Sequence, residues 1–210
     1  MTTLLFIRHG YSEGNKDHRF SGQMDFPLDE AGRLQALDVA DYLCNTYHVD
    51  AIYSSDLSRA YNTVKPLSDA LSLPIHTEKA LREIDVGLWK GVLRSEVEKL
   101  YPETYEIYQK NPGLVRFDGG ESFLEMRERA LNAVQKIVAE NKGKTVVIAT
   151  HGGVIRVLRT VWENIPLERM VEIPQVPNAS VTVVKYEGEF ATMHKAGYCD
   201  YLTERITEKL

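Results

Sequence analysis

The sequence predicts an α/β fold, specifically a three-layer sandwich with a mostly parallel central sheet flanked by helices, plus a helical insertion. Short apolar and β-branched runs alternate with longer segments that have the spacing of amphipathic helices. The alternation breaks between residues 88 and 120, a stretch rich in Tyr, Glu and Pro. We therefore expect a single domain over residues 1–210, with an inserted, cap-like segment around 88–120 that covers one end of the sheet.

The first half of the chain supplies two strand–helix pairs. Residues 2–8 form a short buried strand, and residues 30–47 follow as a helix with Asp29 as its N-cap. The apolar side chains that share one face of this helix are Leu34, Leu37, Ala40 and Cys44. Residues 50–54 read as the next strand. Residues 56–71 have a helical pattern, and Ser55 or Asp56 is expected to cap its start.

The second half continues the alternation and ends in a hairpin. We expect a long amphipathic helix over 121–141 and a β-branched buried strand over 144–150. A further helix over 153–163 has Val154, Leu158 and Val161 on one face. Two final strands, 180–186 and 189–196, flank a Glu-Gly pair and therefore predict a hairpin.

Composition excludes several classes of protein. The formal net charge is -5 and the sequence pI is about 5.7, which argues against a nucleic-acid partner. The first apolar run, 4–7, is too short for a membrane span or a signal-peptide core. Cys44 and Cys199 have neither metal spacing nor the count of a disulfide framework. They fit ordinary thiols of a reducing compartment, so we expect a cytoplasmic protein with no membrane partner.

Three predicted strands end in residues that suit an anion. RHG follows the first strand, SSDLSR the second, and THGG the strand at 144–150. Ligands of open α/β sheets lie beyond the carboxyl ends of the strands, so Arg8, His9, Arg59 and His151 should meet at one edge. Guanidiniums and helix-start amides, here that of Gly152, suit a phosphoryl group. Taken singly, each feature has an ordinary explanation, such as a tight turn or a solvated arginine; only their joint occurrence indicates a site.

Six motifs in order carry a resemblance to a known family. They are RHGYSEGN, GQMDFPLDEAGRLQA, SSDLSRAYNT, LREIDVGLWKG, GGES and THGGVIR, and together they resemble the histidine phosphatase superfamily from Leu4 to about Val184. The resemblance implies a transient phosphohistidine on His9 and an acid/base carboxyl at Glu83. It also implies that Arg8, Arg59 and His151 line the phosphate pocket, with Asn15 and Ser12 near the phosphate.

The chain departs from the family pattern at three positions outside this set. Tyr11 stands where Glu is common, Asn62 where Gln is common, and Lys90 where phosphatases often carry Glu. The mutase branch has an asparagine after its second HG and an arginine- and proline-rich segment that grips a carboxylate. This chain has Gly153 and no such segment, so its pattern favours the phosphatase branch.

The chemistry of these residues agrees with the resemblance. Histidine attacks as neutral imidazole, and nearby cations disfavour its protonated form. Arg8, Arg59 and a protonated His151 would supply those cations and stabilise the transferring phosphoryl group. A single carboxyl can protonate the leaving alcohol and later deprotonate water, and Glu83 is the best candidate.

A metal site is the alternative chemistry for the same side chains. His9, His151 and Glu83 are acceptable zinc ligands. Neither histidine has the short spacing of a metal motif, however, and adjacent arginines would repel a dication. We therefore expect no metal and no cofactor.

The expected function is hydrolysis of small-molecule phosphomonoesters through the phosphohistidine. For the substrate end we select Phe20, Gln23, Met24 and Tyr105. The alternative for Tyr105, which shares a helical face with Tyr101 and Tyr108, is packing of the insertion onto the body. Two rival functions remain, a phosphoglycerate mutase and a catalytically silent phosphate-binding regulatory protein. For the hydrolase and the mutase alike, the partner is a small-molecule phosphomonoester. The sequence does not indicate an oligomeric state.

Overall fold

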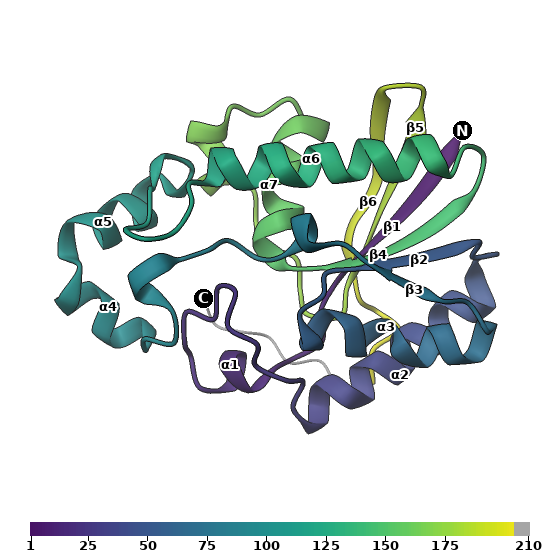
Figure 1. Cartoon of the computed structure of the whole chain (residues 1–210), viewed down its shortest axis with the longest axis horizontal. Helices are drawn as coiled ribbons and strands as arrows, with labels where there is room; N and C mark the ends of the chain where they lie inside the picture. The colour runs from purple at the N-terminus through teal and green to yellow at the C-terminus, as the bar shows by residue number, and fades with distance from the viewer. Residues whose placement is uncertain (204–210) are drawn as a thin grey trace.

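The computed structural model describes residues 1–203, in which six strands form one sheet in the order β3-β2-β4-β1-β5-β6 (Figure 1). The strands are β1 (Thr2–Arg8), β2 (Ala51–Ser54), β3 (Ile75–Thr77), β4 (Thr145–Thr150), β5 (Val181–Glu187) and β6 (Phe190–Tyr198). β1 to β4 run parallel, whereas β5 pairs antiparallel with β1 and with β6. The predicted mostly parallel sheet and the C-terminal hairpin are confirmed.

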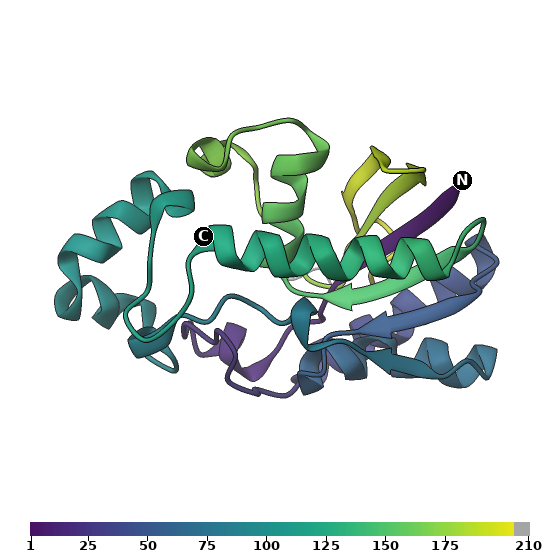
Figure 2. The same ribbon diagram turned by 45° about the horizontal axis from the view of Figure 1, so that its top comes forward.

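The two faces of the sheet pack against different helices. Leu4 and Phe6 of β1 belong to a core shared with α6 (Phe123–Glu140) and α7 (Gly152–Trp162). Leu5 and Ile7, pointing the other way, join a second core with α2 (Glu30–Thr46) and α3 (Ser58–Leu71). Figures 1 and 2 show these helix pairs on opposite faces of the sheet. Both faces are therefore covered, which explains why β1 is a continuous apolar run and confirms the three-layer sandwich.

The expected apolar face of α2 is right at Ala40 and wrong at its other three residues. Leu34 and Leu37 are 44% and 56% exposed and Cys44 is exposed, whereas Gly32, Gln35, Ala36, Val39, Ala40 and Leu43 are buried. A Cβ on Gly32 would lie 1.9 Å from the Tyr11 carbonyl oxygen, and the Gln35 side chain accepts a hydrogen bond from the Tyr11 amide. The buried face therefore combines apolar side chains with a glycine and a hydrogen-bonded amide, which an apolar count does not select.

The expected cap of α3 is also wrong. Leu57 is its N-cap and makes no side-chain cap bond, while Ser55 Oγ accepts from the Leu57 amide. Asp25, distant in sequence, accepts from both the amide and the hydroxyl of Ser58, each at 2.7 Å. The helix start is thus stabilised by a loop that sequence reasoning did not connect to it.

On α7 the predicted face is right at Val154 and Leu158, but Val161 is 42% exposed.

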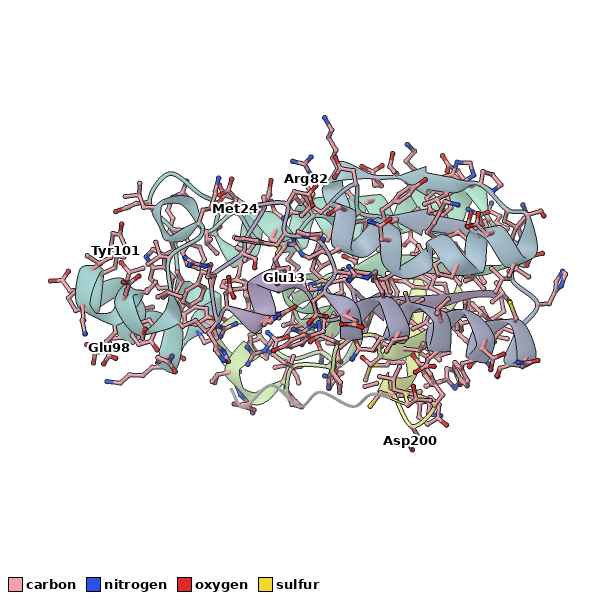
Figure 3. All side chains as sticks on the ribbon, turned by 90° about the horizontal axis from the view of Figure 1, so that it is seen from below. Glu13, Met24, Arg82, Glu98, Tyr101 and Asp200 are labelled. Carbon is pink, nitrogen blue, oxygen red and sulfur yellow. The ribbon has the colours of Figure 1, made fainter. Side chains whose placement is uncertain are left out.

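Residues 88–120 contain two helices, α4 (Arg94–Leu100) and α5 (Pro102–Lys110), with short 3-10 turns at Gly87–Trp89 (η2) and Pro112–Leu114 (η3). The segment projects from one end of the molecule, where Figure 3 labels Glu98 and Tyr101. The buried ring of Trp89 contacts those of Tyr101, Tyr105 and Tyr108. The tyrosine face thus packs the insertion together around one tryptophan.

Two short elements were not expected from the sequence. α1 (Glu13–Lys16) follows β1, and β3 is a three-residue edge strand. Both are too short to show a periodic pattern. Two further 3-10 turns, η1 (Lys79–Leu81) and η4 (Leu167–Glu172), lie before Glu83 and after α7. Across residues 1–203, none of the helices combines the length and the apolar character needed to cross a membrane.

Candidate active site

A cavity of about 440 Å³ lies at the carboxyl ends of β1 and β4, between the sheet and the insertion. Arg8 and His9 reach it from the end of β1, Arg59 from α3, Glu83 from the loop after η1, and Gly152 from the start of α7. The volume suits a small-molecule ligand. The structure therefore brings the proposed nucleophile, the acid/base carboxyl and two cations to one concave site.

His9 presents a neutral ring to this cavity. Its Nδ1 lies 2.7 Å from the Gly10 carbonyl oxygen, which can only accept, so Nδ1 carries the hydrogen and Nε2 keeps a lone pair. Burial lowers the pKa of His9 well below its usual value, and the charges of Arg59 and Arg8 lower it further. The ring is thus in the state that attack on phosphorus requires.

The backbone around His9 is fixed on several sides. Asn178 Nδ2 donates to the His9 carbonyl at 2.9 Å, and the Gly10 amide donates to Thr63 Oγ1 at 2.8 Å. A Cβ on Gly10 would lie 2.8 Å from the Gly32 carbonyl oxygen, so only glycine fits between this turn and α2. These contacts hold the imidazole in one position without using its Nε2.

The two predicted phosphate-binding arginines are anchored through backbone carbonyls. Arg8 Nη1 donates to the Val176 carbonyl at 2.8 Å. Arg59 is only 1% exposed and donates to the carbonyls of Met24 and Gly22 at 2.7 and 2.8 Å. Burial lowers the pKa of Arg59 to about 10, so its guanidinium stays charged at neutral pH. Its Nε has no hydrogen-bond partner within residues 1–203 and is available to a phosphoryl oxygen.

Glu83 is held by two backbone amides. Oε1 accepts from the Ile84 amide at 2.9 Å and Oε2 from the Gly153 amide at 3.1 Å. A Cβ on Gly153 would lie 2.2 Å from Glu83 Oε1, so a larger residue at 153 would displace the carboxyl. Arg129 Nη2 donates to the Glu83 carbonyl at 3.0 Å and fixes the main chain behind it.

His151 lies behind the cavity surface rather than in it. It is fully buried, its ring centroid is 5.2 Å from that of His9, and its Nε2 is 2.9 Å from Ser55 Oγ. Burial, followed by the charge of Arg59, lowers the pKa of His151 well below its usual value. We expected a protonated His151, but this environment favours the neutral ring. A dianion beside it would shift the balance back toward the proton.

The remaining phosphate-end residues fall into two groups. Asn15 and Gly152 line the cavity, whereas Ser12 is buried and caps α1, with its hydroxyl bonded to Asn15. Ser12 therefore orients Asn15 instead of facing the cavity. No group of three or more His, Cys, Asp or Glu side chains in the described part of the chain has the arrangement of a metal site, and the set His9, His151 and Glu83 does not form one.

Comparisons with known proteins identify the family. The model of the histidine phosphatase superfamily (branch 1) matches residues 4–197. The chain belongs to the histidine phosphatase superfamily. Phosphoglycerate mutase-like protein 4 of Arabidopsis thaliana is 34% identical over 205 residues, covering 96% of this chain and 87% of the relative. Phosphoserine phosphatase 1 of Hydrogenobacter thermophilus is 33% identical over 208 residues, covering 99% and 98%.

A solved structure agrees with the same assignment. Bacillus stearothermophilus YhfR superposes on this histidine phosphatase with a TM-score of 0.92 and 32% sequence identity. The match covers 96% of this chain and 100% of that structure. The α/β sandwich is thus consistent with the fold of the superfamily.

Of the four residues selected for the substrate end, Phe20 lines the cavity of this histidine phosphatase and the other three do not. Gln23 instead donates through Nε2 to the Glu83 carbonyl at 3.2 Å, and Met24, labelled in Figure 3, has a side chain 40% exposed to solvent. Tyr105 packs against Trp89 in the insertion. Gln23 and Met24 nevertheless contact residues of the site. Gln23 donates to the Glu83 carbonyl, and the Met24 carbonyl accepts a hydrogen bond from Arg59.

Several lining residues were not expected from the sequence. They are chiefly polar side chains beyond the phosphate end, namely Arg19, Arg94, Tyr108, Gln109, Arg156 and Gln175. None lies in a recognisable local motif, with one exception. Arg156 stands four residues after Gly152, one helical turn along α7, so the helical period places it on the same face.

Proposed function

We propose that this phosphomonoesterase hydrolyses small-molecule phosphate esters in two steps, with the phosphoryl group carried transiently on His9 Nε2. The observation that carries the proposal is the bond from His9 Nδ1 to the Gly10 carbonyl, which leaves Nε2 unprotonated between two arginines. A relative of nearly equal length, phosphoserine phosphatase 1, supports a small phosphate ester as the kind of substrate.

In the first step, Nε2 of His9 attacks phosphorus and the bond from phosphorus to the ester oxygen breaks. Glu83 donates its proton to the leaving oxygen, so an alcohol departs and the carboxylate remains. Arg8, Arg59 and the helix-start amide of Gly152 stabilise the charge on the three equatorial oxygens. The arginines thus supply the positive charge that phosphoryl transfer requires.

In the second step, water attacks the phosphorus and the bond to His9 Nε2 breaks. The Glu83 carboxylate takes a proton from the water, inorganic phosphate leaves, and both residues return to their starting states. The amides of Ile84 and Gly153 keep the carboxyl in one place during both steps. Asn15, which Ser12 orients, is proposed to contact the phosphoryl group, and His151 is proposed to act from behind His9, with its ring bonded to Ser55.

We further propose that the chain is one domain in which residues 88–120 act as a cap over this site. Tyr108, Gln109, Pro112 and Phe117 from that segment line the cavity. Cys44 and Cys199 have neither metal spacing nor the count of a disulfide framework, and we propose the cytoplasm as the place of reaction.

Hydrolysis is favoured over phosphoryl transfer within the substrate. Gly153 stands where the mutase branch has asparagine, and here the missing side chain leaves room for the Glu83 carboxyl. A mutase would move phosphate between positions of phosphoglycerate without releasing it. Measuring free phosphate and the positional isomers of phosphoglycerate in the same reaction separates the two activities.

The intermediate itself gives the direct test. Turnover of a labelled phosphomonoester, stopped in base, should trap label on His9 as an acid-labile, base-stable adduct. His9→Ala should trap none, whereas His48→Ala, which removes a histidine side chain that is 92% exposed, should trap as much as the native protein. Label that survives in His9→Ala, or label on a serine, would refute the assignment.

A further inference from the structure

We propose that the cavity holds a second acidic group of the substrate, a carboxylate or a second phosphate, between Arg94 and Arg156. The inference rests on the proposed function, because it concerns the far end of the same substrate. It narrows the substrate class from phosphomonoesters in general to short phosphomonoesters that carry another anion.

The first observation is the charge of the lining. Its guanidiniums are those of Arg8, Arg19, Arg59, Arg94 and Arg156, and Glu83 is its sole carboxylate within the described residues. A phosphomonoester has at most two negative charges, which Arg8 and Arg59 match. Arg19 lies 3.6 Å from the Asp17 carboxylate. Arg94 and Arg156 form no ion pair with any residue of 1–203, although the protein as a whole has a net charge of -5.

Arg156 is built into the wall rather than extended into solvent. Its Nε donates to the Ile173 carbonyl at 2.7 Å and its Nη2 to the Val171 carbonyl at 3.2 Å. Burial lowers its pKa, and its partners among residues 1–203 are carbonyl oxygens and not a carboxylate. A partly buried cation without a counter-ion is unfavourable, so an anionic ligand is the natural complement.

Arg94 lines the same cavity as Arg156. Arg94 is the first residue of α4, and its guanidinium carbon lies 5.1 Å from the centre of the Phe20 ring. The centre of the same ring lies 5.5 Å from that of the Tyr108 ring. Burial raises the pKa of Tyr108, while Arg94 and Arg156 both oppose that rise. All three side chains line the same cavity, and the charges of both guanidiniums act on the tyrosine hydroxyl.

The far end is closed by contact between the insertion and η4. Gly113 of η3 packs so tightly that a Cβ would lie 2.0 Å from the Leu167 carbonyl oxygen. Arg156 lies one turn after Gly152, roughly 6 Å along the axis at 1.5 Å per residue, and helical side chains lean toward the N-terminus. A short carbon chain is therefore enough to join the reactive phosphate to the second acid.

Three esters that differ at one carbon test the subsite. Glycerol 3-phosphate, 3-phosphoglycerate and glycerol 1,3-bisphosphate carry a hydroxyl, a carboxylate and a phosphate at the same position. The native protein should have a kcat/KM at least about tenfold higher on an acidic ester than on glycerol 3-phosphate, the scale of a charge-assisted hydrogen bond. The better of the two acidic esters assigns the second group as carboxylate or phosphate.

Two variants locate the effect. Arg94→Gln and Arg156→Gln should each reduce kcat/KM on the preferred acidic ester by about 10- to 100-fold, mainly through KM. Glycerol 3-phosphate should be almost unaffected. Arg116→Gln removes an exposed arginine from the same insertion and should change none of the three rates. Arg156→Gln also loses hydrogen bonds to Val171 in η4 and to Ile173 just after it, so thermal unfolding is measured for each variant. Arg94→Gln gives the independent test.

Equal kcat/KM on the three esters, or equal losses on all three in both variants, would overturn the subsite. Failure to hydrolyse any of them would instead count against the proposed function. In that event, calorimetric titration of His9→Ala with the three esters still decides the subsite, because binding needs no turnover. Equal affinity for the three esters would contradict the inference. Tighter binding of the acidic esters that is lost on adding Arg94→Gln would support it.

Discussion

The two ends of the cavity are built in different ways. At the phosphate end, His9, Arg8 and Gly152 follow directly from adjacent parallel strands, and the main chain fixes each of them. At the far end, Arg94 and Arg156 come from the insertion and from the second turn of α7. In the proposed scheme, the reaction chemistry depends on the edge of the sheet, whereas substrate choice depends on two helix side chains that are distant in sequence.

This difference makes a prediction about breadth of effect. Changes at the phosphate end should slow the reaction with every ester, because they act on the transferring group. Changes at the far end should act on acidic esters alone.

The largest loss is expected for Glu83→Gln, which keeps the shape of the side chain but cannot give up a proton. On alkyl phosphates the rate should fall by about a hundred- to ten-thousandfold. Nitrophenolate leaves without help, so phosphorylation of His9 by nitrophenyl phosphate should suffer far less. Slower hydrolysis of the intermediate should then expose a burst of released phenol in stopped-flow measurements.

The control for Glu83 is the leaving group itself. If both leaving groups lose equally in the phosphorylation step, Glu83 positions the phosphate or the fold, and His151 becomes the first candidate for the acid. That result would also weaken the distinction between the two ends of the cavity, because Glu83, which is assigned to the chemical step, would act on binding.

Arg59→Ala should lower kcat by roughly a hundred- to a thousandfold on all esters, the scale of losing one transition-state donor. The same variant also frees the carbonyls of Met24 and Gly22, so Arg59→Lys is measured beside it to separate charge from anchoring. Chelators should leave the native rate unchanged. Restoration of a chelated enzyme by zinc or magnesium would contradict the view that arginines supply the charge.

Gly153→Ala tests whether the close approach to Glu83 matters. The new Cβ would lie 2.2 Å from Oε1, so the carboxyl must move, and a displacement of about 1 Å can cost on the order of a hundredfold. Alkyl phosphates should be affected more than nitrophenyl phosphate, as for Glu83→Gln. Ala149→Gly is the control, because it makes a change of the same size in β4, the strand that leads into α7. Gly143→Ala cannot serve as the control, because the positive φ of Gly143 would strain an alanine there. A uniform loss on both leaving groups would separate Gly153 from the acid/base step.

The smallest effect concerns stability against pH. The folded pKa values of His9 and His151 lie below the unfolded value of about 6.5, so below that pH the unfolded chain binds more protons. The free energy of unfolding should therefore fall as pH falls below about 6.5, by at most about 2.7 kcal/mol per pH unit for two histidines. Urea unfolding between pH 7.5 and 5 measures the slope.

His9→Asn should reduce that slope by up to one proton, about 1.4 kcal/mol per pH unit. An unchanged slope in His9→Asn would mean that the His9 ring is protonated in the folded protein. The nucleophile would then have to lose a proton before attack.

The sequence by itself determined the phosphate end. RHG and THGG lie at the ends of neighbouring strands, and parallel strands bring their carboxyl ends to one edge whatever the loops do. His9, Arg8, Arg59 and Gly152 could therefore be selected without coordinates, and the resemblance added Glu83. The alternation that predicted the sandwich is a local property of the chain, since each strand and helix shows its own period.

Only the tertiary structure decided the rest. Arg94, Tyr108 and Arg156 line one cavity because the insertion packs against η4, and no local pattern records that contact. The buried face of α2 and the capping of Ser58 by Asp25 depend in the same way on partners distant in sequence. Periodicity reports which residues share a face, but burial and charge pairing are set by what lies opposite, and that is fixed only when the chain has folded.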